Sequence, residues 1–155
     1  MIVMTNLFSA SASEIFAAAM KDYGRAVIVG DKKTHGKGTV QTVSDIDRFL
    51  PFFTAQSFKG GTVKLTNAKF YRINGESTQL KGVIPDITFP DFTETLENVG
   101  EDKLDYALQW DTVPPRKYTL FSGAEHLKAI LPELQKRSQE RVDKSPVFQA
   151  MRQDI

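Results

Sequence analysis

Ser9-Ala10-Ser11-Ala12-Ser13-Glu14 opens the stretch that decides the fold, and Ile15-Phe16-Ala17-Ala18-Ala19-Met20 completes it. The alanine-rich second part has high helix propensity, the serines ahead of it can cap a helix, and a glutamate in the first turn suits the helix dipole. We expect this helix to end near Gly24, because glycine commonly stops a helix at its C-terminus. Buried strands are predicted over residues 2–5 before the helix and 25–29 after it. The order strand, helix, strand predicts a layered α/β domain.

Downstream of this unit, the sequence predicts short strands and then helices. A β-branched strand is expected over residues 39–43, further strands over 62–66 and 69–73, and a hairpin turn at Asn74-Gly75. Composition shifts after about residue 90, so we place a domain boundary near residue 92. Residues 1–92 are predicted to be a mixed α/β (α+β) unit.

The remaining residues, 93–155, are predicted to form an all-helical extension, with a tryptophan- and proline-containing connector over residues 110–115 and strongly helical sequence from Ala124 to the end. Two prolines, Pro132 and Pro146, are expected either to start new helices or to kink one.

Bulk composition limits the classes of function. The chain has 155 residues, of which 41% are hydrophobic, which is enough for one domain with a sizeable core. A formal net charge of +1 gives no electrostatic reason to expect a nucleic acid or an anionic membrane as partner. The absence of cysteine excludes disulfides, a thiolate zinc site and a cysteine nucleophile.

The N-terminus does not read as a targeting segment. Residues 1–6 lack the basic and long apolar regions of a signal peptide, and no run in the chain approaches the roughly 18 apolar residues that span a bilayer. Because the chain opens abruptly on a core strand, we expect it to be a fragment of a longer protein.

Ser11 is a candidate nucleophile because it lies between a strand and a helix. A tight strand-to-helix turn lifts a hydroxyl out of the sheet edge, and the first N–H groups of a helix have no intrahelical partner. The N–H of Ala12 could therefore stabilise a developing oxyanion, with the helix dipole adding to the effect. On local pattern alone, Ser9, Ser11 and Ser13 could equally be helix caps.

Lys37 is the candidate general base. A serine hydroxyl needs a base to be a good nucleophile, and a lysine can serve when burial lowers its pKa. Lys37 lies between Gly36 and Gly38, which permit a close backbone approach, and a strand follows at once. His35 is interpreted as a loop residue that packs beside the site, and His126 as a solvated helix residue.

The glycine-lysine loop has an alternative reading as a phosphate-binding loop. The spacing from Gly30 to Gly36 is one residue too long for that motif, and Gly38 stands where a magnesium-binding hydroxyl is needed. A strand rather than a helix is predicted to follow, which also opposes this reading. A surface or anion-binding role for Lys37 stays open on local pattern.

Several segments, in order along the chain, carry a more specific signal. They are the run of residues 9–20, Asp22-Tyr23-Gly24-Arg25-Ala26, Val29-Gly30, Gly36-Lys37-Gly38-Thr39-Val40-Gln41, residues 70–79, and Gly82-Val83-Ile84-Pro85-Asp86-Ile87. Together they resemble the C-terminal half of the protease domain of the C-terminal processing (tail-specific) serine proteases, peptidase family S41. The resemblance covers residues 1–92. Residues 107–111 and 131–134 resemble the helical C-terminal extension of larger bacterial members.

The resemblance implies a ClpP/crotonase-like layered protease core, present in part, and a role for each motif residue. Ser11 matches the nucleophile, Lys37 the general base, and Gln41 the glutamine that orients the lysine, while the N–H of Ala12 falls at the oxyanion hole. Asp22 matches a position sometimes proposed as a third member. A carboxylate beside Lys37 would raise the pKa of the lysine and oppose base function. We therefore interpret Asp22 as a structural residue at the helix end.

The same resemblance implies a serine endopeptidase that acts through an acyl-enzyme on proteins with apolar C-terminal tails, without cofactor or metal. It also implies a periplasmic or cell-envelope location, a PDZ domain elsewhere in the parent chain, and membrane association only through a missing N-terminal region. An upstream glycine of the oxyanion hole would be absent, so we expect the fragment itself to be inactive. The loop over residues 31–35 is one residue longer than in many relatives, which leaves its contact with substrate open.

Two other classes of function remain as alternatives. The extension could dock an adaptor or form a dimer, although its apolar residues Leu127, Ile130, Leu131 and Leu134 also fit a helix face buried within the chain. A crotonase-like acyl-transfer relative would stabilise an enolate with backbone N–H groups and would not need the Ser–Lys pair.

Overall fold

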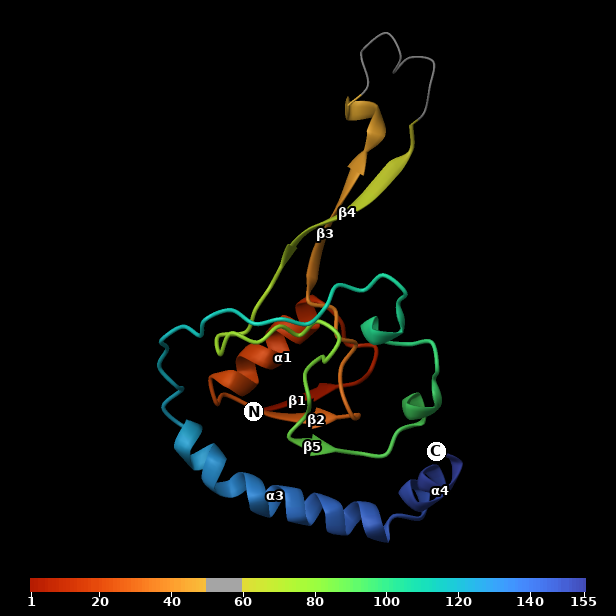
Figure 1. The fold of residues 1–155 in the computed structure, drawn as a ribbon. Helices are drawn as coiled ribbons and strands as arrows, with labels where there is room; N and C mark the ends of the chain where they lie inside the picture. The colour runs from red at the N-terminus through yellow and green to blue at the C-terminus, as the bar shows by residue number, and fades with distance from the viewer. Residues whose placement is uncertain (50–59) are drawn as a thin grey trace. The chain divides into compact units, whose positions relative to one another are not determined.

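The computed structural model describes residues 1–49 and 60–155, which form two compact units. We call Met1–Gly38 together with Tyr71–Ile155 the sheet unit, and Thr39–Phe70 the hairpin unit. Figure 1 labels their helices and strands. The predicted mixed α/β class is confirmed. Of the three predicted catalytic residues, Ser11 and Lys37 belong to the sheet unit and Gln41 to the hairpin unit.

The sheet unit is organised around three parallel strands. β1 (Ile2–Thr5) pairs with β2 (Val27–Gly30), and β2 pairs with β5 (Ile87–Thr88), giving the order β1-β2-β5. Helix α1 (Ala12–Asp22) connects β1 to β2, as parallel strands require a crossover connection. The predicted order strand, helix, strand is therefore confirmed.

Small side chains bring α1 close to the sheet. Ala17 and Ala18 of α1 form a buried cluster with Ala26, Ile28 and Val83, against which other apolar residues pack. Tyr23 caps the C-terminal end of α1, and Gly24 follows with a φ of 65°, a conformation that favours glycine. The alanine run thus serves both as a helix former and as the tightly packed inner face of α1.

The hairpin unit consists of β3 (Thr39–Asp45) paired antiparallel with β4 (Thr62–Lys69), with the short 3-10 helix η1 (Ile46–Phe49) after β3. The prediction of separate strands over 62–66 and 69–73 is wrong, because residues 62–69 form one continuous strand in register with β3. The register shifts between Val40 and Gln41.

The predicted turn at Asn74-Gly75 is present, although it does not join two strands. The N–H of Gly75 donates to the Arg72 carbonyl at 2.9 Å, and Tyr71 and Ser77 form an isolated bridge. A Cβ at Gly75 would lie 2.0 Å from the Val113 carbonyl oxygen, so a later segment packs directly on the turn. The N–H of Val113 donates to the Gly75 carbonyl at 2.8 Å, and the N–H of Arg116 donates to the Ile73 carbonyl at 3.0 Å.

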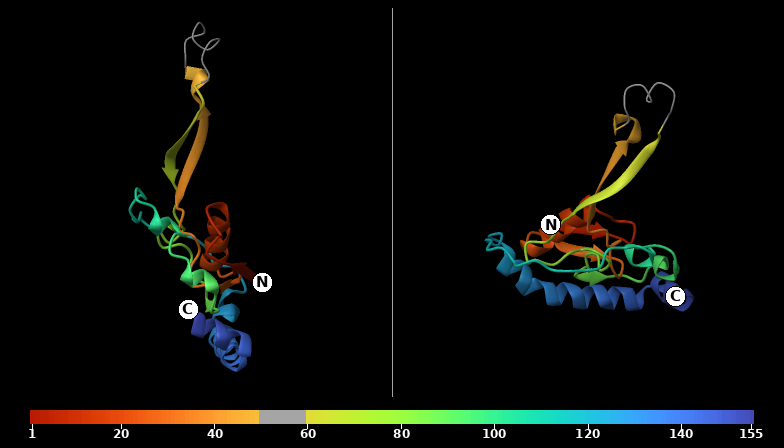
Figure 2. Two further views of the ribbon diagram at one scale, coloured as in Figure 1. Left: turned by 90° about the vertical axis from the view of Figure 1, so that its right-hand side faces the viewer. Right: turned by 45° about the horizontal axis from the view of Figure 1, so that its top comes forward.

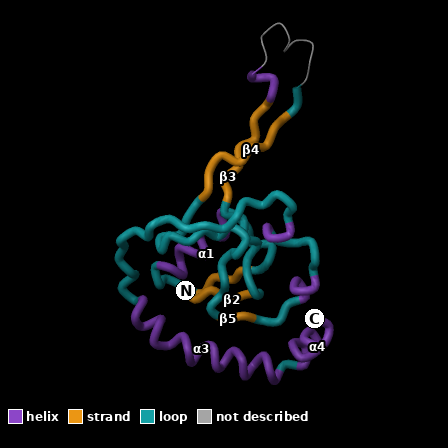
Figure 3. Tube along the Cα trace, in the orientation of Figure 1, coloured by secondary structure: helices purple, strands orange, loops and turns teal. Residues whose placement is uncertain are grey.

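The extension is helical in its second half. Short 3-10 helices η2 (Phe92–Thr95) and η3 (Glu101–Lys103) come first, whereas residues 104–123 are drawn as loop in Figure 3. The prediction of an all-helical extension thus differs from the structure over residues 104–123. This stretch contains Pro114 and Pro115, and its Val113 and Arg116 N–H groups bond to the turn.

Two helices complete the sheet unit, α3 (Ala124–Lys144) and α4 (Pro146–Asp154). Pro146 starts α4, while Pro132 lies inside α3 without ending it. In the views of Figures 1 and 2 the strands of the sheet lie between α1 and α3, and the Gln135 amide of α3 donates to the Asp86 carbonyl at 2.8 Å. No helix within the described ranges is long and apolar enough to cross a bilayer.

The buried cluster predicts which apolar residue stabilises this chain. Ile28 is fully buried, so Ile28→Ala should lower the free energy of unfolding by about 2–5 kcal/mol. Ile84 is 60% exposed, so Ile84→Ala should change it by less than about 0.5 kcal/mol. Urea denaturation followed by circular dichroism measures both, and equal midpoints for the two variants would contradict the assigned core.

Candidate active site

Ser11 occupies the turn between β1 and α1 in a strained backbone conformation. It is the N-cap of α1 and has φ 55° and ψ −112°. Non-glycine residues rarely adopt positive φ, and such strain, of order 1–3 kcal/mol, concentrates at functional sites. Ala12 follows as the first residue of α1, so its N–H has no intrahelical acceptor. The Ser11 side chain is half-buried.

Glu14 connects the Ser11 turn to the loop that carries Lys37. Its side chain is fully buried. Its Oε2 accepts from the N–H of Ser11 at 2.8 Å and from the N–H of Lys37 at 2.9 Å. Its Oε1 accepts from the Thr34 hydroxyl at 2.5 Å and from the N–H of Gly36 at 2.7 Å. A buried carboxylate is tolerated when its oxygens are hydrogen-bonded in this way.

The segment Gly36-Lys37-Gly38 is held from its other side by residues 79–80. The N–H of Leu80 donates to the Gly36 carbonyl at 2.8 Å, and the N–H of Gly38 donates to Oε1 of buried Gln79 at 2.9 Å. A Cβ at Gly38 would lie 2.6 Å from the Gln79 nitrogen, and Gly36 has a φ of 92°. Both glycines flanking Lys37 are therefore required by close packing or backbone conformation.

The Lys37 side chain is half-buried, and among the described residues its ammonium has no hydrogen-bond or ion-pair partner. No direct hydrogen bond joins the Ser11 hydroxyl to Lys37 in the part of the chain that the structure describes. Catalytic hydrogen bonds are often long in structures without substrate, so this arrangement is compatible with a Ser–Lys pair. The structure brings the two residues together through their backbones, both of which bond to Glu14.

Gln41 lies in the hairpin unit, directly after the register shift in β3. Its amide nitrogen donates to the Thr66 hydroxyl at 3.3 Å, and its side chain is exposed. The predicted role of Gln41 in orienting Lys37 stays a prediction.

Asp22, at the end of α1, forms a bidentate ion pair with Arg72. Arg72 Nε donates to Asp22 Oδ2 at 2.9 Å, and Arg72 Nη2 donates to Asp22 Oδ1. Only 8% of the Asp22 side chain and 15% of the Arg72 side chain are exposed. The hydrogen bond to Asp22 raises the pKa of Arg72 despite the opposing effect of burial. Asp22 therefore ties α1 to the turn over residues 72–76.

The two histidines have different surroundings. The N–H of His35 donates to the Ser9 carbonyl at 3.0 Å, which is a second link between the serine segment and the lysine loop. Its buried Nδ1 lies 3.9 Å from Oε2 of Glu101, without a hydrogen bond. His126 is exposed on α3.

The sequence did not indicate the role of the buried polar residues that hold these loops, which are Glu14 as a bridge, Thr34, Gln79 and Glu101. The side-chain amide of Gln79 donates from Nε2 to Glu101 Oε1 at 3.0 Å, and the backbone N–H of Glu101 donates to the His35 carbonyl at 2.9 Å. The only local signal was the glutamate three residues after Ser11, which fits a capping box. Nothing local indicates that the same carboxylate reaches residues 34–37.

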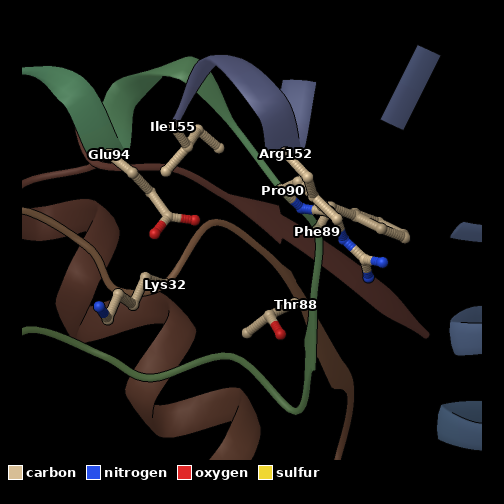
Figure 4. A pocket seen from close by; sticks show the side chains of 7 residues that line it. All are labelled: Lys32, Thr88, Phe89, Pro90, Glu94, Arg152 and Ile155. Atoms are coloured by element: carbon tan, nitrogen blue, oxygen red, sulfur yellow. The ribbon is translucent and has the colours of Figure 1, made fainter. Parts of the chain in front are cut away.

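The sheet unit has several surface pockets. Figure 4 shows one of about 330 Å³ near the end of β5, lined by Lys32, Thr88, Phe89, Pro90, Glu94, Arg152 and Ile155. Neither Ser11 nor Lys37 lines it. Within the described ranges, no group of three or more His, Asp or Glu side chains could hold a metal ion.

Comparisons with known proteins identify two matching families. A sequence model described as peptidase family S41 matches residues 1–89, and one described as the C-terminal domain of tail-specific protease matches residues 95–155. The chain is 43% identical over 156 residues to the tail-specific protease of Haemophilus influenzae, covering all of this chain and 22% of that protein.

Other relatives match a shorter part. The chain is 37% identical to the carboxy-terminal processing protease CtpA of Bacillus subtilis over 95 residues, which is 60% of this chain and 18% of that protein. The structure aligns with a photosystem II D1 C-terminal processing protease at 35% identity and a TM-score of 0.45, covering 57% of this chain and 20% of the other. The chain thus spans about a fifth of the length of these relatives.

The Asp22–Arg72 pair predicts a measurable coupling between two buried side chains. Removing Asp22 leaves the Arg72 guanidinium with only its exposed partner Glu76, whose Oε2 lies 3.2 Å from Arg72 Nη1. Breaking a buried ion pair is costly, so Asp22→Leu should destabilise this chain by about 3 kcal/mol. The double variant Asp22→Leu/Arg72→Met should be less destabilised than the sum of the single variants. Urea denaturation measures all three. Strict additivity would show that the two side chains do not interact.

Proposed function

Since this chain belongs to peptidase family S41, we propose that its full-length protein is a serine endopeptidase with Ser11 as nucleophile and Lys37 as general base. The observation that carries this proposal is the positive φ of Ser11 at a strand-to-helix turn. Strained turns of this kind hold the nucleophilic serine of hydrolases so that its hydroxyl is exposed and the next N–H faces the oxyanion. The resemblance to tail-specific proteases supports substrates that are proteins recognised by their C-terminal tails.

The proposed reaction proceeds through an acyl-enzyme. Neutral Lys37 accepts the Ser11 hydroxyl proton as Ser11 Oγ attacks the scissile carbonyl carbon. The N–H of Ala12 donates to the oxyanion of the tetrahedral intermediate. Lys37 then protonates the leaving amine, and the peptide bond breaks. In the second half, Lys37 accepts a proton from water as the water oxygen attacks the ester carbonyl carbon. Lys37 then returns that proton to Ser11 Oγ as the bond between Oγ and the acyl carbon breaks and the acid product leaves.

Other groups that the reaction needs are proposed to lie outside residues 1–155. We infer that a second oxyanion donor and a PDZ domain that captures apolar C-terminal tails belong to the rest of the full-length protein, in the cell envelope. Losing one oxyanion donor typically slows an enzyme by about 10²–10³-fold. Residues 1–155 alone should therefore show little or no hydrolysis.

The proposal predicts the effect of two substitutions in the full-length protein. Ser11→Ala and Lys37→Ala should each reduce hydrolysis of a protein substrate with an apolar C-terminus by at least about a thousandfold, with circular dichroism unchanged. Lys32→Ala is the matched control, because Lys32 is an exposed lysine of the same loop.

Three outcomes are distinguishable by following cleavage on gels over time. Loss of activity in both variants with an active control supports the pair. Full activity in Lys37→Ala places the base elsewhere. Full activity in Ser11→Ala removes the serine mechanism and favours other acyl-transfer chemistry.

A further inference from the structure

Glu14 is a buried charged group that none of the proposed chemical steps uses. Its side chain is 0% exposed, and four donors surround its two oxygens. Burying a carboxylate is costly unless it is fully hydrogen-bonded, and bonds from N–H groups to a charged acceptor are about twice as strong as neutral ones. A full set of donors around a carboxylate that contacts the backbone of the proposed nucleophile therefore calls for a functional explanation.

The way the donors divide between the two oxygens carries that explanation. Oε2 is shared by the N–H groups of Ser11 and Lys37, the two proposed catalytic residues. Oε1 takes the Thr34 hydroxyl and the N–H of Gly36, both from the lysine loop. One carboxylate thus contacts the nucleophile turn once and the base loop three times.

We propose that Glu14 is a positioning residue, whose carboxylate sets the spacing between the Ser11 turn and the Lys37 loop. The inference rests on the proposed function, because spacing matters only if these residues react together. Glu14 does not contact the reacting atoms in this account. It acts by holding the backbones of the two residues that do, and misplacement by about 1 Å can slow a reaction about 100-fold.

A simpler role as a helix cap makes a different prediction. In a capping box, the side chain at this position accepts only from the N-cap N–H, so glutamate and glutamine are interchangeable. Holding the lysine loop instead requires both oxygens as acceptors. Glutamine keeps one oxygen and places an NH₂ group against N–H donors. Glu14→Gln therefore separates the two roles.

The experiment measures covalent labelling of the full-length protein by a small fluorophosphonate probe. Two quantities are recorded, the second-order rate constant and the final labelled fraction. A protein that is partly unfolded labels a smaller fraction, whereas a protein with a misplaced base labels fully but slowly. Glu125→Gln is the matched control, because Glu125 is an exposed acid in the first turn of α3.

We expect Glu14→Gln to lower the rate constant by roughly 10- to 100-fold with the labelled fraction unchanged, and Glu125→Gln to match the wild type. A rate constant for Glu14→Gln equal to that of the wild type would reduce Glu14 to a cap and overturn the inference. Failure of the wild type itself to label would refute the proposed function, and the inference with it.

A second pair of variants decides the matter if Glu14→Gln does not fold. Thr34→Val removes one loop contact to Oε1, together with the bond that the Val83 N–H donates to the same hydroxyl, and leaves the bond between Glu14 and Ser11 in place. Thr34→Ser keeps the hydroxyl. Slower labelling to full extent in Thr34→Val, with the wild-type rate restored in Thr34→Ser, supports the inference. Equal rates in Thr34→Val and the wild type overturn it.

Discussion

The fold of the candidate site depends on one buried carboxylate. Glu14 is presented from the first turn of α1, and its four hydrogen bonds reach Ser11 behind it and residues 34–37 in the loop after β2. Because the carboxylate is fully buried, losing any of these donors would leave a charged oxygen poorly solvated, which is expensive in free energy. The serine turn and the lysine loop are therefore fixed together, although 26 positions separate Ser11 from Lys37 in the sequence.

Close backbone packing supports this arrangement from the opposite side. Gly38 lies so near Gln79 that a Cβ would overlap its nitrogen, and Gln79 is in turn held by Glu101. The strain at Ser11 persists because its N–H is bonded to Glu14 and α1 is anchored on the sheet by Ala17 and Ala18. Rigid surroundings on both loops are what a catalytic pair needs, since the Lys37 ammonium has no hydrogen-bond or ion-pair partner among the described residues to orient it.

The sequence predicted what depends on local patterns and missed what depends on distant contacts. The strand, helix and strand at the N-terminus follow from the alanine run and the apolar residues around it, and Gly24 follows from helix-ending chemistry. The continuous β4 was not predicted, because its length is set by pairing with β3 rather than by its own residues. The positive φ of Ser11 and the contacts of Glu14 with residues 34–37 had no local signal, since serine and glutamate are ordinary residues at a helix start. The candidate residues themselves came from local chemistry and family resemblance, whereas the means of holding them in place required the structure.

The most direct test of this account is to locate the covalent adduct. The full-length protein would be reacted with a fluorophosphonate, digested and analysed by tandem mass spectrometry. The account predicts a single modified serine at Ser11, where strain, the helix start and the Glu14 contact coincide. An adduct on Ser9, on Ser13 or on a serine elsewhere in a folded and active enzyme would contradict it, because the residue held by Glu14 would then not be the nucleophile.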